Sequence, residues 1–375
     1  MKHIGILIFV GIFAACETIP AQTVTTHPRP TDPFAQRWQW GLKEGLAARN
    51  SKGYYIVYSI QKLMAENSYM STGSFMTGTI TTSFTLYDLI NGGRSVDSNL
   101  TDAAEKALRR IRNKGRAEFK VMKDLAIIIE YPSGKSNPED ITDVSICNME
   151  LEFDFEGKTI LWLGPAGDPE SFAILKNSFP HVRSREPQEN LVSAIGAHKP
   201  TQESFTFLSG VLEGRYPTDT REQAAFWLGW HATPAALKLL ASTAQNDNSE
   251  DVREQAVFGI SQMETPEALD ALIDLARNAK DSEVRQKAVF WLGQSASRKA
   301  VGEVEDIVMN DADVEVQKQA LYALANAEDE KGVEFLIKIA RMHPKPALRK
   351  HAIHSLGQSE DPKAIEAIIA IAKGR

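Results

Sequence analysis

An internal period of about 32 residues, repeated five times, constrains the fold of this chain more than any other feature. Each repeat contains a marker residue, which is an arginine in four repeats and a glutamine in one. An alanine stands three positions after the marker, and apolar residues stand four and seven positions after it. Spacings of three, four and seven place these residues on one face of a helix, and the alanines indicate that another helix approaches closely there. The repeat markers are Arg221, Arg253, Arg285, Gln317 and Arg349.

Each period contains a second helix after a short break. Glycines close to the end of the apolar stripe (Gly229, Gly293 and Gly357) predict that the first helix ends there. Good N-cap residues then stand in register, three of them followed by proline, as the start of a helix prefers. A sixth, modified unit precedes these five. The expected N-cap residues are Thr201, Thr233, Thr265, Ser297, Asp329 and Asp361.

These residues resemble HEAT repeats. The segments 252–257 (VREQAV) and 284–289 (VRQKAV) are similar to the helix start of the HEAT-like repeats named after phycobilisome lyases. The resemblance covers about residues 186–375 and implies an α-solenoid of about six helix-turn-helix repeats, in which stacked neighbours form one core. It also implies a hydrogen-bonded ladder along the arginine column, weaker at Gln317. The whole chain resembles exported bacterial proteins that contain HEAT repeats and have no established activity.

The start of the chain, residues 1–21, predicts an export signal. A basic start, Met1-Lys2-His3, precedes an apolar run from Ile4 to Ala15 that is shorter than the roughly 20 residues of a membrane-spanning helix. Phe13-Ala14-Ala15-Cys16 resembles a bacterial lipobox, which implies lipidation of Cys16, although the family usually has leucine in place of Phe13. Cleavage after Ala21 is the alternative. We expect an exported protein, periplasmic or anchored to the membrane as a lipoprotein.

Between the signal and the solenoid, the sequence predicts a linker and a small domain. Residues 22–33 are polar and rich in proline, which is typical of a tether. Residues 34–185 predict a helix (34–48) followed by a small α+β domain with strands near 54–60, 118–131, 144–155 and 159–163 and a helix over 101–113. No catalytic motif is evident in it, and Cys147 is expected to be a structural strand residue.

The charges argue against nucleic acid as a partner. Residues 201–375 contain 20 Lys and Arg against 27 Asp and Glu, and subtracting these from the chain totals of 42 and 49 leaves 22 of each sign elsewhere. All of the net negative charge therefore falls on the solenoid, whereas nucleic-acid binding requires a basic surface.

Two surfaces of the solenoid are candidate binding sites for a protein. Acidic residues recur on the second helices, on the side that HEAT folds typically make concave: Asp270, Asp274, Glu303, Asp306, Glu334 and Glu366. Aromatic residues recur on the first helices, where they either pack between helices or form a recognition stripe. They are Phe226, Phe258, Phe290 and Tyr322. The last helix also carries several isoleucines, which predict weak self-association through the last repeat.

The sequence favours binding over catalysis. The His-Glu pairs of the HEAT-like deoxyhypusine hydroxylases do not occur, and His351 and His354 have no evident third metal ligand, so we expect no metal and no cofactor. We therefore expect an exported scaffold that binds a protein partner through its solenoid. The alternative is an enzyme, or a subunit of one, with activity in the α+β domain or in the cleft beside the solenoid.

Overall fold

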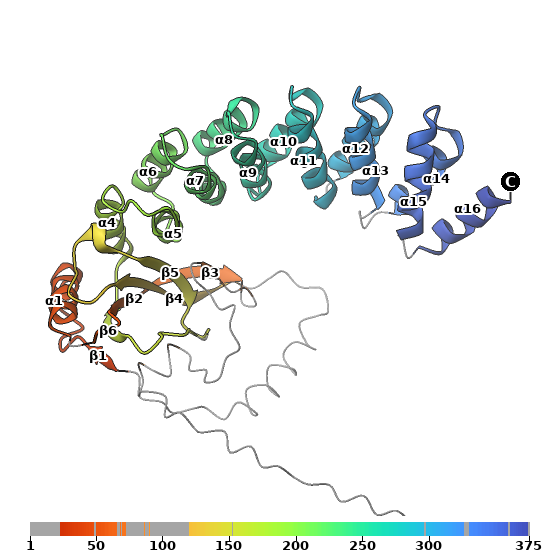
Figure 1. Ribbon diagram of the computed structural model, residues 1–375. Coiled ribbons are helices and arrows are strands. Elements are labelled where there is room, and N and C mark those ends of the chain that lie inside the picture. Colours follow the sequence, from red (N-terminus) through yellow and green to blue (C-terminus); the bar gives the residue numbers. More distant parts are fainter. Residues whose placement is uncertain are drawn as a thin grey trace, which may run out of the picture.

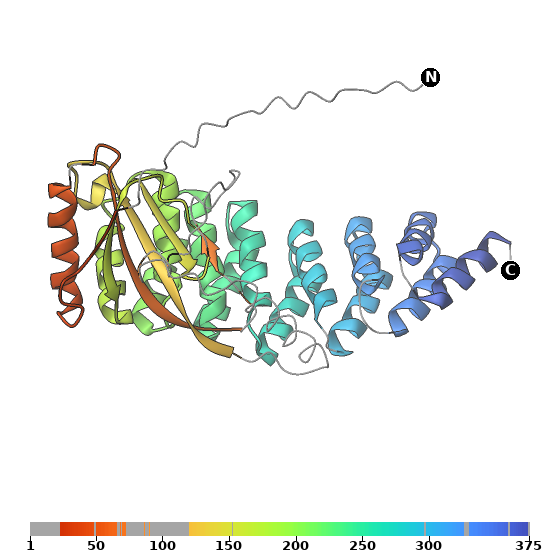
Figure 2. The same cartoon turned by 90° about the horizontal axis from the view of Figure 1, so that it is seen from below.

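The solenoid is an arc of helix pairs whose first end is covered by a β-sheet (Figures 1 and 2). The computed structural model describes residues 23–48, 50–65, 68, 70–72, 86, 90, 120–151, 153–295, 298–325, 330–358 and 361–373. The predicted helix over 101–113 and the sites Cys16, Ser297 and Asp329 lie outside them. Within the described residues, no helix is both long and apolar enough to cross a lipid bilayer.

The arc consists of six helix pairs, as the sequence predicted. The first helices are α5 (Arg185–Gly196), α7 (Thr218–His231), α9 (Glu250–Ser261), α11 (Ser282–Gln294), α13 (Val314–Ala325) and α15 (Pro346–Gln358). The second helices are α6 (Gln202–Leu212), α8 (Pro234–Asn246), α10 (Pro266–Asn278), α12 (Arg298–Asn310), α14 (Glu330–Met342) and α16 (Pro362–Ala372). The side chains of Thr233, Thr265 and Asp361 accept the predicted cap hydrogen bonds.

The two columns of small residues allow the first helices to stack closely. Ala256 and Ala288 are fully buried, as expected. The first helices end close to the predicted glycines, because α7, α11 and α15 stop one or two residues after Gly229, Gly293 and Gly357. A Cβ atom on Gly229 would lie 2.5 Å from the carbonyl oxygen of Gly259 in α9. Glycine is therefore required at this position by the close approach of two backbones.

A six-stranded sheet precedes the arc, with the order β1-β6-β2-β4-β5-β3. Its long central strands, β2 (Tyr54–Ala65) and β4 (Lys120–Tyr131), are antiparallel. The remaining strands are β1 (Val24–Thr26), β3 (Ser71–Thr72), β5 (Asp143–Asn148) and β6 (Thr159–Pro165). In the part of the chain that the structure describes, the predicted α1 (Phe34–Ala47) and an unpredicted α4 (Asp168–Ser178) accompany the sheet.

The sequence prediction differs from the sheet in two places. Residues 24–26, inside the predicted linker 22–33, form β1 and pair in parallel with Ile160–Trp162 of β6. The strand expected over 144–155 ends at Asn148, because residues 149–151 turn away from the sheet. Pairing with distant residues decides both outcomes, and local composition does not contain that information.

One hydrophobic core runs from the sheet into the solenoid. The face of β2 that bears Ile56 and Tyr58 packs with α1, α4 and α5 in the same cluster as the stacked helices as far as α16. The opposite face, with Val57 and Cys147, belongs to a separate cluster. Because the core is continuous, the sheet and the solenoid form one packed body, and the sheet covers the end of the helix stack that would otherwise expose apolar surface.

Candidate functional site

The two rows of helices lie on opposite sides of the arc. In Figure 1 the second helices α8, α10, α12 and α14 follow the outer edge, and the first helices α7, α9, α11, α13 and α15 follow the inner edge. The expectation that the acidic side of the second helices is concave is therefore wrong. The repeat period defines how two helices pair within a unit, but the curvature depends on how successive units stack.

The outer acidic residues are largely engaged in ion pairs and hydrogen bonds between repeats or within a helix. Arg277 binds Glu303 at 2.5 Å and Asp306 at 2.9 Å. Asp270 pairs with Lys299, Glu334 with Lys363 at 3.4 Å, and Asp274 accepts a 2.8 Å hydrogen bond from Asn278. The sixth residue of the set, Glu366, is exposed on α16. Four of the six outer acidic residues therefore bind cations of an adjacent repeat, and at these positions a basic partner would compete with the lysines and the arginine already bound there.

The aromatic column lies along the inner edge, where it is continuous through three repeats. The rings of Phe226 and Phe258 are stacked, with centroids 5.7 Å apart, and Phe258 contacts Trp291 at 5.0 Å. Phe290 also contacts Trp291 at 5.0 Å. The three phenylalanines are half-buried, whereas Tyr322 is exposed. The rings therefore pack between repeats and still present an apolar edge on the inner surface.

Three columns of the first helices make up this inner surface, which we name the inner stripe. They stand two positions before, one position after and five positions after each ladder residue, so spacings of three and four place them on one helix face. In order from α7 to α15 the inner stripe consists of Asp219, Glu222, Phe226, Asp251, Glu254, Phe258, Glu283, Gln286, Phe290, Glu315, Lys318, Tyr322, Ala347, Lys350 and His354.

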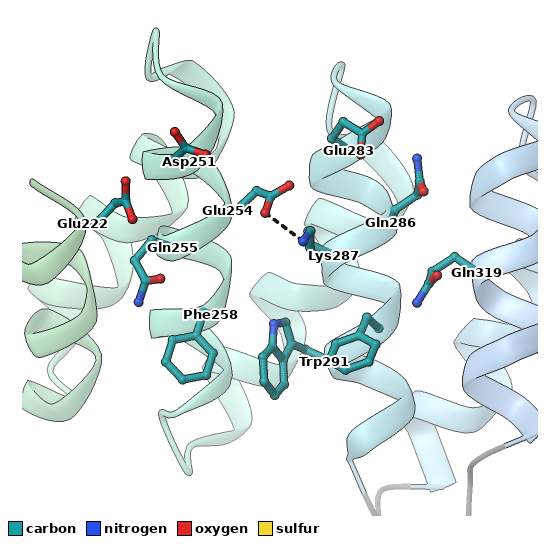
Figure 3. A pocket seen from close by; sticks show the side chains of 11 residues that line it. Glu222, Asp251, Glu254, Gln255, Phe258, Glu283, Gln286, Lys287, Trp291 and Gln319 are labelled. Atoms are coloured by element: carbon teal, nitrogen blue, oxygen red, sulfur yellow. Dashed lines mark ion pairs between the residues drawn. The ribbon is translucent and has the colours of Figure 1, made fainter. Parts of the chain in front are cut away.

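A pocket of about 590 Å³ opens in the inner stripe around α9 and α11. Figure 3 shows its carboxylates, including Asp251 and Glu283, at one end and the rings of Phe258 and Trp291 at the other. Of the residues that line it, Lys287 is the one cation, and it binds Glu254 at 2.7 Å. The pocket therefore has an apolar end and a predominantly negative end. We name the apolar end, with Phe258, Phe290 and Trp291, the aromatic floor, and the negative end the acidic rim.

Two glutamates of the rim and its surroundings have raised pKa values. Partial burial raises the pKa of Glu222, and the nearby charges of Asp251 and Asp219 raise it further. The pKa of Glu189 on α5 is also raised, mainly by burial. A cation from a ligand would relieve this crowding, because an opposite charge nearby favours the ionised carboxylate.

Sequence analysis missed the acidic part of the inner stripe, although a signal was present. Asp219, Asp251 and Glu283 occupy the same position in successive repeats, and Glu222 and Glu254 form a second column three positions later. A search for polar columns on the same helix face as the aromatic residues would have found them. The sequence prediction favours the acidic residues of the second helices instead, because it assigns the concave side to that row.

The arginine ladder orders the loops that join the repeats. Arg285 donates to the carbonyl oxygen of Ala279 at 2.8 Å and to Asp311 at 3.2 Å, and Arg221 and Arg253 pair in the same way with Asp247 and Asp281. On α13 the buried Gln317 takes the place of the arginine, and Lys345 takes the place of the aspartate. Gln317 donates to the carbonyl oxygen of Val308 and accepts from Lys345, both at 2.7 Å.

A buried polar cluster joins the sheet to the solenoid. Lys62 of β2 donates to the carbonyl oxygen of Ala197 at 2.8 Å and lies 5.2 Å from the ring centroid of Trp227. Burial lowers the pKa of Lys62 to about 8, and Asp168 opposes this shift. Beside it, the hydroxyl of Ser171 lies 2.9 Å from that of Tyr58 and 2.8 Å from Nε2 of His198. These contacts are internal to the chain and account for the cluster as a structural joint.

Part of the last helix faces solvent, as its isoleucines predicted. Ile365 and Ile369 are about half exposed, whereas Ile368 and Ile371 are partly buried against the core. The structure contains a single chain, so self-association through this surface stays a prediction. On α15, His354 is exposed and 6.3 Å from His351 between ring centroids.

Comparison with known proteins agrees with this architecture. The family model for HEAT repeats matches residues 206–293 and 301–374, so the solenoid is built of HEAT repeats. No curated protein sequence matches the chain. HEAT repeats are typical of protein-interaction scaffolds, and the chain has the architecture of one.

Several solved structures are similar to parts of the chain. Human deoxyhypusine hydroxylase is 18% identical over 55% of this chain and 79% of its own, with a TM-score of 0.25. The CpcE–CpcF complex of phycocyanin lyase from Nostoc sp. PCC7120 is 19% identical over 41% of this chain and 97% of its own, with a TM-score of 0.31. Lipovitellin is 14% identical over 66% of this chain and 31% of its own, with a TM-score of 0.39.

Proposed function

We propose that this protein is an interaction scaffold that binds a protein partner through the inner stripe. The observation that carries the proposal is the pocket around α9 and α11, where half-buried aromatic rings form the floor of a concave, negatively rimmed surface. Aromatic side chains held by their neighbours are favourable anchors, because little conformational entropy is lost when a partner covers them.

The contrast with the outer surface supports the inner one. At four of the six outer acidic residues, a partner would compete with an existing ion pair such as Arg277–Glu303. On the inner side, a partner can add apolar contacts to Phe258 and Trp291 without breaking their mutual contact. Binding there removes apolar surface from water, which contributes about 25 cal/mol per Å² of area buried.

Affinity capture with matched variants tests the proposal. Full-length protein carrying Phe258→Ala and Phe290→Ala should lose a partner that the wild type retains. Met309→Ala, at an exposed apolar residue of α12, should retain it. If the inner double variant captures the same partner as the wild type, the inner stripe is not the binding surface. Equal thermal unfolding of the two variants is the control for folding.

We further propose that the scaffold acts after export, tethered to a membrane through lipid on Cys16 or free in the periplasm after cleavage near Ala21. The basic and apolar start of the sequence supports export, and Cys16 after two alanines supports lipidation. Cys16→Ser should release the protein from the membrane fraction of a bacterial host. Equal soluble amounts of both forms would exclude the lipid anchor and favour cleavage near Ala21.

A further inference from the structure

The inner stripe reverses its charge along the solenoid. On α7, α9 and α11 its ionisable residues are all acidic, five in number across the three helices, beginning with Asp219 and ending with Glu283. On α15 the same columns hold Lys350, which carries their single formal charge, and His354, and both side chains are exposed. The acidic and the basic ends are thus carried by equivalent positions of successive repeats, and they face the same side of the arc.

The helix between the two ends is balanced. On α13, Lys318 binds Glu315 of the same helix at 2.7 Å. The sign of the stripe therefore changes in steps from negative, through a neutral pair, to positive. A ligand of uniform charge would be attracted by one end and repelled by the other, since like charges brought together at an interface disfavour binding.

We infer that the partner of the inner stripe is a protein segment with two charged halves, lysines and arginines over α7–α11 and aspartates and glutamates over α15. This inference rests on the proposed function, because it names the partner of the same surface. The aromatic floor of Phe258 and Trp291 suits the aliphatic stems of arginine and lysine, whose heads then reach the acidic rim. Charge complementarity also gives the segment one direction along the arc.

The length of the segment follows from the stacking. Neighbouring packed helices lie roughly 8–10 Å apart, so the four steps from α7 to α15 span about 32–40 Å. A helical segment covers that distance with about 25 residues at 1.5 Å per residue. An extended segment needs only about 12 residues at roughly 3.3 Å each. A peptide of the helical length can therefore reach both ends in either conformation.

Two synthetic peptides of the helical length provide the probes. One has an Arg/Leu half followed by a Glu/Ala half, and the other continues the Arg/Leu pattern throughout. Their affinities for the full-length protein are measured by fluorescence anisotropy at low and at moderate salt. The wild type should bind the two-signed peptide at least tenfold more tightly than the all-basic one, and moderate salt should reduce both affinities because it screens exposed charges.

Variants of equal charge change locate the contact. Glu222→Lys with Glu254→Lys on the inner stripe should lower the affinity for the two-signed peptide at least tenfold. Asp270→Lys with Glu303→Lys on the outer surface makes the same change in net charge and should alter it less than twofold. Lys350→Glu should weaken the two-signed peptide several-fold and strengthen the all-basic one. A milder variant, Glu222→Gln with Glu283→Gln, covers the case in which the double lysine variant does not fold.

Three outcomes would overturn the inference. Equal losses of affinity in the inner and outer variants would mean that basic peptides bind through the overall negative charge of the protein and not at a defined site. If the protein bound the two peptides with equal affinity, and Lys350→Glu changed neither, a partner with one basic and one acidic half would be excluded. The sequence also contains a basic run at residues 106–116 (KALRRIRNKGR). Peptide binding that appears only after this run is neutralised would make the run the occupant. The aromatic variant Phe258→Ala, Phe290→Ala separates the two proposals, because its loss of a partner supports the binding surface even where the charge variants have no effect.

Discussion

The inner and outer faces of the solenoid carry similar acidic residues with different surroundings. On the outer face, side chains such as Asp270 and Glu303 bind cations of an adjacent repeat. On the inner face, Glu222 and its neighbours crowd one another above an aromatic floor, and Glu222 has a raised pKa. Ion pairs between repeats also occur on the inner face, where Asp219 binds Arg185 and Glu254 binds Lys287. Among the described residues, Glu222, Asp251 and Glu283 have no such cation. The comparison teaches that a column of charge in a repeat protein indicates a binding surface where the adjacent repeats leave part of that charge unpaired.

The largest expected effect concerns the ladder that holds both faces in register. Arg285→Ala should lower the free energy of unfolding by about 2–4 kcal/mol, because it leaves the mostly buried carboxylate of Asp311 without its cation. Chemical denaturation measures this. The half-exposed pair Lys287–Glu254 of the inner face provides the control, and Lys287→Ala should cost less than about 1 kcal/mol. Equal costs would show that the ladder is no more than a surface feature.

The next effect concerns the alanine column between the first helices. Ala288→Leu should destabilise the fold by about 1–3 kcal/mol, because the added atoms overpack a fully buried contact. Ala347→Leu, at an exposed position of the inner stripe on α15, should leave thermal unfolding within the error of the measurement. If Ala288→Leu were equally silent, the stacking of the inner row would be looser than described.

The repeat columns predicted the stacked helices, their caps and the number of repeats, because each column depends on residues a few positions apart. The period could not predict which row is concave, and for that reason the acidic candidate residues lie on the outer side, whereas the aromatic candidate residues lie on the inner side. The outer ion pairs were within reach of the sequence, since Asp270–Lys299 and Glu334–Lys363 share a spacing of 29 residues. In the sheet, β1 and α4 escaped prediction because their places depend on long-range pairing and packing.

A smaller effect, dependent on pH, concerns the joint between the sheet and the inner row. The pKa of Lys62 is about 8 in the folded chain and 10.5 in the unfolded chain. Between these two pH values the unfolded chain therefore binds more protons than the folded chain. Its contribution to stability therefore rises as the pH increases from about 8. From pH 7.5 to 9.5 the stability of the wild type relative to Lys62→Met should rise by about 1 kcal/mol, after allowance for partial exposure.

The neighbours of Lys62 do not obscure this window. Burial lowers the pKa values of His198 and His231, so both imidazoles keep their charge state between pH 7.5 and 9.5. A stability difference that stays flat across this range would show that the ammonium of Lys62 is well hydrated and that the joint is open to water.

The smallest effect concerns the ion pairs on the outer side of the arc. Arg277→Ala removes the cation shared by Glu303 and Asp306 and should cost about 0.5 kcal/mol at low salt, because the pairs are partly exposed. The cost should fall further as salt is added. A loss above about 2 kcal/mol that does not depend on salt would contradict this account, because it would mean that the outer ion pairs stabilise the fold as strongly as buried pairs.

Carboxyl footprinting tests the central claim most directly, because both faces carry the reporting groups in one molecule. The full-length protein is labelled with a carbodiimide and an amine, with and without the two-signed peptide, and the modified residues are quantified by mass spectrometry. Our account predicts that the peptide protects Glu222, Asp251 and Glu283, while Asp274 and Glu366 of the outer row react as before. Protection of the outer residues with unchanged labelling of the inner ones would contradict it.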